Sequence, residues 1–160
     1  MSVLFPTFTV EELAALITAD TKGLGLVAEL DAGSLGHVTT KLNDPTIPNA
    51  DSVKANAMQT SEFSVLVDGG DLANLSTNGK SILNFYMSSG DGQIQIGEDN
   101  VQEALLGNEC FNSGDFPTTH NAILAASRRP GSVMEAAFGR DVRVNDDQVA
   151  AARDYIAANP

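Results

Sequence analysis

The chain has 160 residues and a formal net charge of −12, and its composition excludes several protein classes. Apolar residues make up 42% and charged residues 19%, which excludes the low-hydrophobicity, high-charge composition of disordered proteins. The single cysteine, Cys110, excludes an internal disulfide and a zinc site built from several thiolates. There is neither a run of ~18 apolar residues nor a signal-peptide pattern, so we expect no membrane span and a cytoplasmic place of synthesis.

The negative charge is unevenly distributed along the chain. Residues 1–127 contain four lysines and sixteen acidic residues, for a net charge of −12, whereas residues 128–160 hold all five arginines against five acidic residues. Strong negative charge opposes approach to phosphates, so we expect no direct nucleic-acid binding. The neutral, arginine-bearing segment is either part of a solvated surface or a docking element for an acidic partner surface, such as another copy's N-terminal part.

The first predicted helix follows Thr9. The letters T-V-E-E place Glu12 three residues after a hydroxyl cap, which is the capping-box spacing. Apolar residues then recur on one face, as expected for an amphipathic helix. They are Val10, Leu13, Leu16 and Ile17.

A short apolar segment comes next, and Ser34 can cap a further helix. That helix must end near Asn43, because Pro45 disfavours helical geometry at the preceding residue. Residues 44–57 are rich in turn-forming residues and predict a long ordered loop or an interface arm.

The rest of the chain predicts more short helices, each recognised by a capping residue followed by a one-sided apolar pattern. They begin at Thr60 or Ser61 (with a stop at Gly69-Gly70), Ser76 or Thr77, Asp99 or Asn100, Thr118 or Thr119, Ser132 (with a stop at Gly139), and Asn145.

The only alternating pattern is Gln93–Ile96, for which no strand partner is evident. We therefore predict an all-α fold of about eight short helices, with at most one extended segment or hairpin near residues 93–96. Residues 1–160 would form a single domain, with possible sub-bundles 1–43 and 58–160 joined by loop 44–57.

No catalytic centre is recognisable in the sequence. Residues 23–28 read G-x-G-x-x-A, but a helix rather than a strand precedes them, so a helix-to-helix turn is expected instead of a dinucleotide site. His37 and His120 lie outside any metal-binding spacing, and Cys110 between Glu109 and Phe111 is expected to be a core residue. We expect no enzyme activity, no cofactor and no metal site.

Several segments together resemble a group of small helical proteins encoded among the structural genes of tailed bacteriophages. They are T-A-D-T-K-G-L-G-L-V-A-E-L (Thr18–Leu30), K-L-N-D-P-T (Lys41–Thr46), the helix at Thr60–Val67, and the signature R-R-P-G-S-V-M-E-A-A-F-G-R-D-V-R-V-N-D-D-Q-V-A-A-A-R (Arg128–Arg153). Where relatives have Ser-Arg-Ala-Glu, this chain has Ser132-Val133-Met134-Glu135.

The resemblance implies a non-enzymatic virion or assembly component of the tail, neck or fibre-attachment region. Such a protein would be assembled in the host cytoplasm and would contact other virion proteins in multiple copies within a symmetric assembly. The candidate interface residues are Arg128, Arg129, Arg140, Arg143, Ile47, Val53, Ile94 and Ile96. The alternative is a small acidic regulatory or inhibitory protein that occupies a basic site on a host protein.

Overall fold

The computed structural model of the chain describes residues 3–160 and is mostly helical. It is 54% helical, and its described residues form ten helices and four short strands in two small antiparallel sheets. The expectation of a mainly helical protein is confirmed. The strict all-α assignment is wrong, and so is the limit of one extended segment, because short strands also form at residues 52–54, 58–59 and 128–130.

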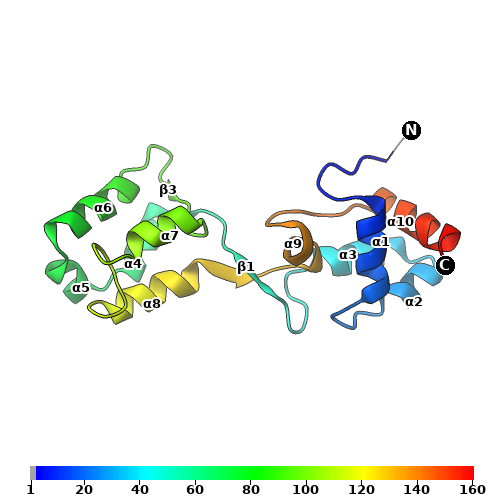
Figure 1. Cartoon of the computed structure of the whole chain (residues 1–160), viewed down its shortest axis with the longest axis horizontal. Helices are drawn as coiled ribbons and strands as arrows, with labels where there is room; N and C mark the ends of the chain where they lie inside the picture. Colours follow the sequence, from blue (N-terminus) through cyan, green and yellow to red (C-terminus); the bar gives the residue numbers. More distant parts are fainter. Residues whose placement is uncertain (1–2) are drawn as a thin grey trace. The chain divides into compact units, whose positions relative to one another are not determined.

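The chain divides into two compact units (Figure 1). The terminal unit combines the residues up to Val53 with Pro130–Pro160, and the central unit is Lys54–Arg129. This division does not coincide with the sub-bundles 1–43 and 58–160 considered from the sequence. The difference arises because residues 130–160 pack with the N-terminal residues rather than with their neighbours in sequence.

The terminal unit contains five helices, and residues far apart in sequence meet in it. The C-terminal helix α10 contacts both α1 and α3, and α9 also contacts α3. In Figure 1 the red α10 lies beside the blue α1. The bounds are α1 Val10–Ala19, α2 Leu26–Asp31, α3 Leu35–Asn43, α9 Val133–Phe138 and α10 Asp146–Ala158.

Local hydrogen bonds start three of these helices as the sequence predicts. Thr9 and Glu12 form a reciprocal capping box, with both N···O distances 3.1 Å. Ser132 and Glu135 form a second box at the start of α9. Asn145 caps α10, and its backbone N–H donates to the Gln148 side chain at 3.0 Å. Ser34 precedes α3 as expected, but its side chain makes no capping hydrogen bond.

The core of the terminal unit is formed by the apolar faces of its helices, on which apolar residues recur with the helical period. Its centre contains buried residues from α1, α3, α9 and α10, which remove a large apolar area from water. The fully buried members are Leu13, Ile17, Val38, Leu42, Met134, Val149 and Ala152. Phe8 adds an aromatic edge, since its ring stacks on Phe138 at a centroid distance of 4.9 Å.

The central unit contains the other five helices and one sheet. The antiparallel strands β2 Met58–Gln59 and β3 Gln93–Ile94 pair Met58 with Ile94 and Gln59 with Gln93. This pairing gives the extended segment the partner that the sequence did not reveal. The helices are α4 Thr60–Leu66, α5 Gly69–Asn74, α6 Thr77–Met87, α7 Asp99–Leu105 and α8 Pro117–Ala126.

Two boundaries in the central unit differ from those expected. The glycine pair at 69–70 starts α5 instead of only stopping α4, because the Asp68 carboxylate accepts a hydrogen bond from the Asp71 backbone at 3.0 Å. Helix α8 begins at Pro117, a residue whose missing N–H is harmless in a first turn. Thr119, a predicted cap, is instead fully buried inside the helix.

A second two-stranded sheet lies where the chain passes between the units. It pairs β1 Ser52–Lys54 with β4 Arg128–Pro130. On the terminal side, the Gly131 N–H donates to the Asp51 carbonyl at 2.8 Å, and on the central side the Ala55 N–H donates to the Ser127 carbonyl at 2.8 Å.

Candidate interaction surfaces

The glycine turn at residues 23–28 is closed by a side chain of this chain. The Asp20 carboxylate accepts hydrogen bonds from the backbone N–H groups of Leu24, Gly25 and Leu26 at 2.8, 2.9 and 3.2 Å. Gly23 and Gly25 have the positive φ values, 63° and 73°, that bend the backbone around it. The donors that would bind a phosphate are thus already occupied, which is a physical reason to treat residues 23–28 as a structural turn.

The two histidines occupy unrelated places. His37, on α3, is 73% exposed, and its Nδ1 lies 3.0 Å from Glu29 Oε2. His120, on α8, has Nδ1 2.9 Å from the Phe111 carbonyl oxygen. Each histidine serves a local structural contact.

Cys110 is buried in the core of the central unit. Its Sγ–H donates to the Gly79 carbonyl at 3.6 Å, and burial raises the pKa of the thiol above its ordinary value. A buried thiol with a raised pKa is a poor nucleophile.

Residues 3–160 contain neither a metal-binding cluster of side chains nor a membrane-spanning helix. No group of three or more His, Cys, Asp or Glu side chains lies close enough to hold a metal ion in this range. Over the same range, no helix has both the length and the apolar character needed to cross a membrane.

The four apolar interface candidates lie inside the protein. None of them is more than 9% exposed, so they are not available to a partner in this conformation. Ile94 and Ile96 belong to the central core because alternate residues of an extended segment point to the same side. Ile47 belongs to the terminal core, and Val53 lies against Gly131, where an added Cβ would come within 2.4 Å of Val53.

The four arginine candidates remain at the surface, but three have partners within the chain. Arg128, Arg129 and Arg140 each make an interaction; Arg129 Nε donates to Asn56 Oδ1 at 2.8 Å, and Arg140 Nε lies 3.9 Å from Asp141 Oδ2. Arg143 is exposed and lines a shallow hollow of about 370 Å³ beside Thr39 and Asn43.

The two units share the negative charge. The terminal unit has twelve acidic and five basic residues, for a net charge of −7, and the central unit has nine acidic and four basic residues, for −5. The neutral C-terminal segment is not a separate end of the molecule, since it packs on the acidic N-terminal segment of its own chain. Apolar residues such as Val149 and Ala152 contribute to that internal contact.

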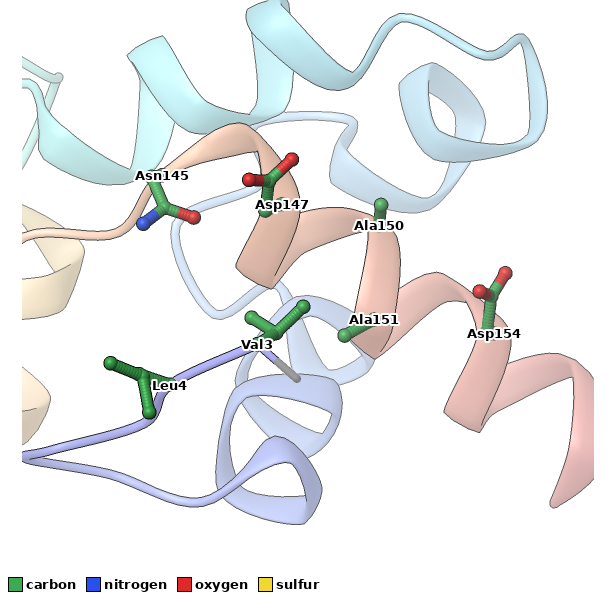
Figure 2. Close-up of a pocket in the computed structure, with 7 residues that line it drawn as sticks. All are labelled: Val3, Leu4, Asn145, Asp147, Ala150, Ala151 and Asp154. Carbon is green, nitrogen blue, oxygen red and sulfur yellow. The ribbon is translucent and has the colours of Figure 1, made fainter. Parts of the chain in front are cut away.

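An open groove of about 520 Å³ lies between the N-terminal arm, residues 3–8, and α10 (Figure 2). We call it the arm groove. Leu4 is 78% exposed and Val3 is 39% exposed on one side. On the α10 side the groove is lined by polar side chains and by small alanines. These residues are Asn145, Asp147, Ala150, Ala151 and Asp154.

The central unit also exposes large apolar side chains. They come from four of its helices, one residue from each. These residues are Val65, Leu72, Phe85 and Leu124.

Comparison with known proteins adds no family assignment: no protein-family model matches the chain, and no curated protein or solved structure matches it at a significant level.

Proposed function

We propose that this protein is a non-enzymatic structural or assembly component of a tailed-phage virion, in the tail, neck or fibre-attachment region, and that it acts through protein–protein contacts. The proposal starts from the resemblance of residues 18–30, 41–46, 60–67 and 128–153 to small phage structural proteins. The observation that carries it furthest is the arm groove, which leaves Leu4 exposed beside a helix. Exposed apolar side chains next to a groove are typical of surfaces that bind another protein.

The glycine turn at residues 23–28 and the buried Cys110 thiol also favour a role in protein–protein contacts over a catalytic role. The donors at residues 24–26 are bound to Asp20, and Cys110 is enclosed with a raised pKa. An enzyme hypothesis therefore depends mainly on His37 and His120. Substituting both histidines and Cys110 should leave the function intact, and loss of function with a folded protein would revive that hypothesis.

The direct experiment is mass spectrometry of washed virions from an infected culture. We expect the protein in the particles, at a copy number fixed by the symmetry of the assembly. Detecting it in the infected-cell lysate but never in washed virions would reject the virion role.

A regulatory function is the second candidate, and the net charges of −7 and −5 favour it. An acidic protein that occupies a basic site on a host protein should lose that partner as salt is raised, because exposed charges are screened. A pull-down at low and high salt tests this. A partner retained at high salt would instead indicate contacts made by apolar surfaces.

The arginine docking hypothesis is tested most cleanly by reversing the charge of Arg143 alone. Arg140 is half-buried near Asp141, so reversing its charge would disturb the fold. Arg143→Glu alone should preserve the fold and weaken assembly if Arg143 contacts an acidic partner. Unchanged assembly would remove Arg143 from the interface.

A further inference from the structure

One wall of the arm groove is tied to α10 by a hydrogen bond, although it is built from residues near the start of the chain. Gln148, a residue only 6% exposed, donates from its Nε2 to the Leu4 carbonyl at 2.7 Å. Its Oε1 accepts from the Asn145 backbone at 3.0 Å, so Gln148 is fixed at both ends of its amide. The backbone at Leu4 is thereby held while its side chain stays in water.

Aromatic contacts anchor the next part of the arm. The Phe5 and Phe8 rings meet edge to face with centroids 5.6 Å apart, and Phe8 stacks on Phe138. Chain termini are usually poorly ordered unless such contacts tie them down. A partner that binds beside Leu4 would therefore meet an ordered surface and would lose little entropy in ordering it.

The opposite wall of the arm groove combines charge with small side chains. Asp147 and Asp154 are separated by two helical turns on α10, or about 10.5 Å along its axis. Between them Ala150 and Ala151 allow a bound chain to approach closely. Asp154 lies 3.4 Å from its neighbour Arg153, whereas Asp147 makes no ion pair within residues 3–160.

We propose that the arm groove binds a cationic, aliphatic peptide segment of a partner protein. Apolar side chains of the segment would cover Val3 and Leu4, and its lysines or arginines would face Asp147 and Asp154. That the partner is a protein rests on the proposed function. That the bound segment is basic rests on the negative charge of the groove.

The same charges argue against other occupants. A second copy that docked groove to groove would bring two aspartates from each copy into one interface, and the residues that line the groove include no lysine or arginine to pair with them. Nucleic acid and anionic lipid would be repelled as well.

The test is an NMR titration of the full chain labelled with ¹⁵N. The probe is a peptide of about twelve residues of leucine and alanine with two lysines spaced to match Asp147 and Asp154. We expect shifts of the backbone amides of Leu4, Ala150 and Ala151. A peptide with glutamates in place of the lysines should not bind, and raised salt should weaken the lysine peptide.

The variants separate the charge from the fold. Asp147→Asn with Asp154→Asn should weaken the lysine peptide by about tenfold, the effect of losing two exposed ion pairs. Asp146→Asn is the matched control, because Asp146 immediately precedes Asp147 on α10 but does not line the arm groove. Its peptide affinity should stay unchanged.

Three results would overturn the inference: no binding of the lysine peptide, equal binding of the glutamate peptide, or equal weakening by Asp146→Asn. The virion experiment is independent of these. Absence from washed virions with a groove that binds the lysine peptide would reject the virion role and leave the groove assignment standing.

Discussion

Asn43 and Val144 are 101 positions apart, yet the Asn43 side chain pairs with both backbone groups of Val144. Its Nδ2 donates to the Val144 carbonyl at 2.8 Å, and its Oδ1 accepts from the Val144 N–H at 2.9 Å. The side-chain amide thus makes the same pair of hydrogen bonds that a backbone peptide makes in a β-sheet. The pair joins the end of α3 to the segment before α10. It fixes the point at which the C-terminal segment returns to the N-terminal helices.

Replacing Asn43 with Asp should destabilise the terminal unit. The variant removes the Nδ2 donor and places a carboxylate against a carbonyl, at an expected cost of ~1–3 kcal/mol of unfolding free energy. Urea denaturation followed by circular dichroism measures it. Asn121→Asp, at an exposed site on α8, adds the same charge and should change little. Equal effects of the two substitutions would contradict a specific role for the pairing.

Asp20 should contribute more to the stability of the terminal unit than is usual for a half-exposed residue. It ends α1 in the left-handed region, with φ 39°, and its carboxylate holds three N–H groups. Asp20→Ala should lower the unfolding free energy by about 2–3 kcal/mol, because charged acceptors are lost and alanine is strained there.

Asp20→Asn should cost less than Asp20→Ala, since asparagine tolerates this conformation and keeps one acceptor oxygen. Thermal denaturation of both variants gives the ranking. The reverse order would show that the carboxylate does not hold the turn.

Gly79 should tolerate no side chain. A Cβ there would lie 2.6 Å from the Glu109 carbonyl oxygen and 2.7 Å from Leu75 Cγ, where α6 meets the 107–111 loop. Gly79→Ala should destabilise the central unit by ~1–3 kcal/mol through overpacking. Gly90→Ala is the control, because a Cβ at Gly90 meets open space. Differential scanning calorimetry should resolve a loss for the first variant and none for the second.

Glu29 should make stability depend on pH in acid. The pKa of its carboxyl is lowered below the ordinary value of 4.5, first by the hydrogen bond from Lys41 and then by that from His37. A carboxyl whose pKa is lowered in the folded state stabilises the fold at pH values above its ordinary pKa. This contribution is lost as the pH falls through the lowered pKa of the folded state.

The matching measurement is the unfolding free energy between about pH 6 and pH 3. Glu29→Gln should reduce the slope of stability against pH over this window. Glu11→Gln, in the exposed first turn of α1, is the control. An unchanged slope in the Glu29 variant would mean that the contacts with Lys41 and His37 add nothing to stability.

Removing the central unit should leave the terminal unit folded. Val53 and Pro130 lie on the paired strands β1 and β4, and the Gly131 N–H donates to the Asp51 carbonyl, so a short glycine-containing loop can replace residues 54–129 and join the two segments. The shortened chain retains the whole terminal core. We expect a cooperative thermal transition and a dispersed amide spectrum; a collapsed, non-cooperative product would show that the terminal unit depends on the central one.

Sequence alone determined the features whose hydrogen bonds are local. The boxes at Thr9 and Ser132 and the cap at Asn145 are contacts over three residues, so residue type and spacing suffice to predict them. The end of α3 at Asn43 likewise follows from Pro45. Periodicity also marked the buried faces, because a helix has a fixed repeat.

Only the tertiary structure decided which segments meet. The partner of Ile94 is Met58. In the first turn of α8, the Thr119 N–H donates to Oδ2 of Asp71 on α5 at 3.1 Å. Such contacts depend on closing long loops, for which no local pattern in the sequence exists.

The interface candidates illustrate the same division. Ile94 and Ile96 were attractive because they alternate with polar residues, yet the pairing of β3 turns both into the core. Leu4 gives no signal in the sequence, and its exposure follows from Gln148 holding its carbonyl 144 positions away. Composition fixed the acidity of the chain, but the return of residues 130–160 to the N-terminal helices decided where charge and apolar surface meet, because packing joins residues regardless of their separation.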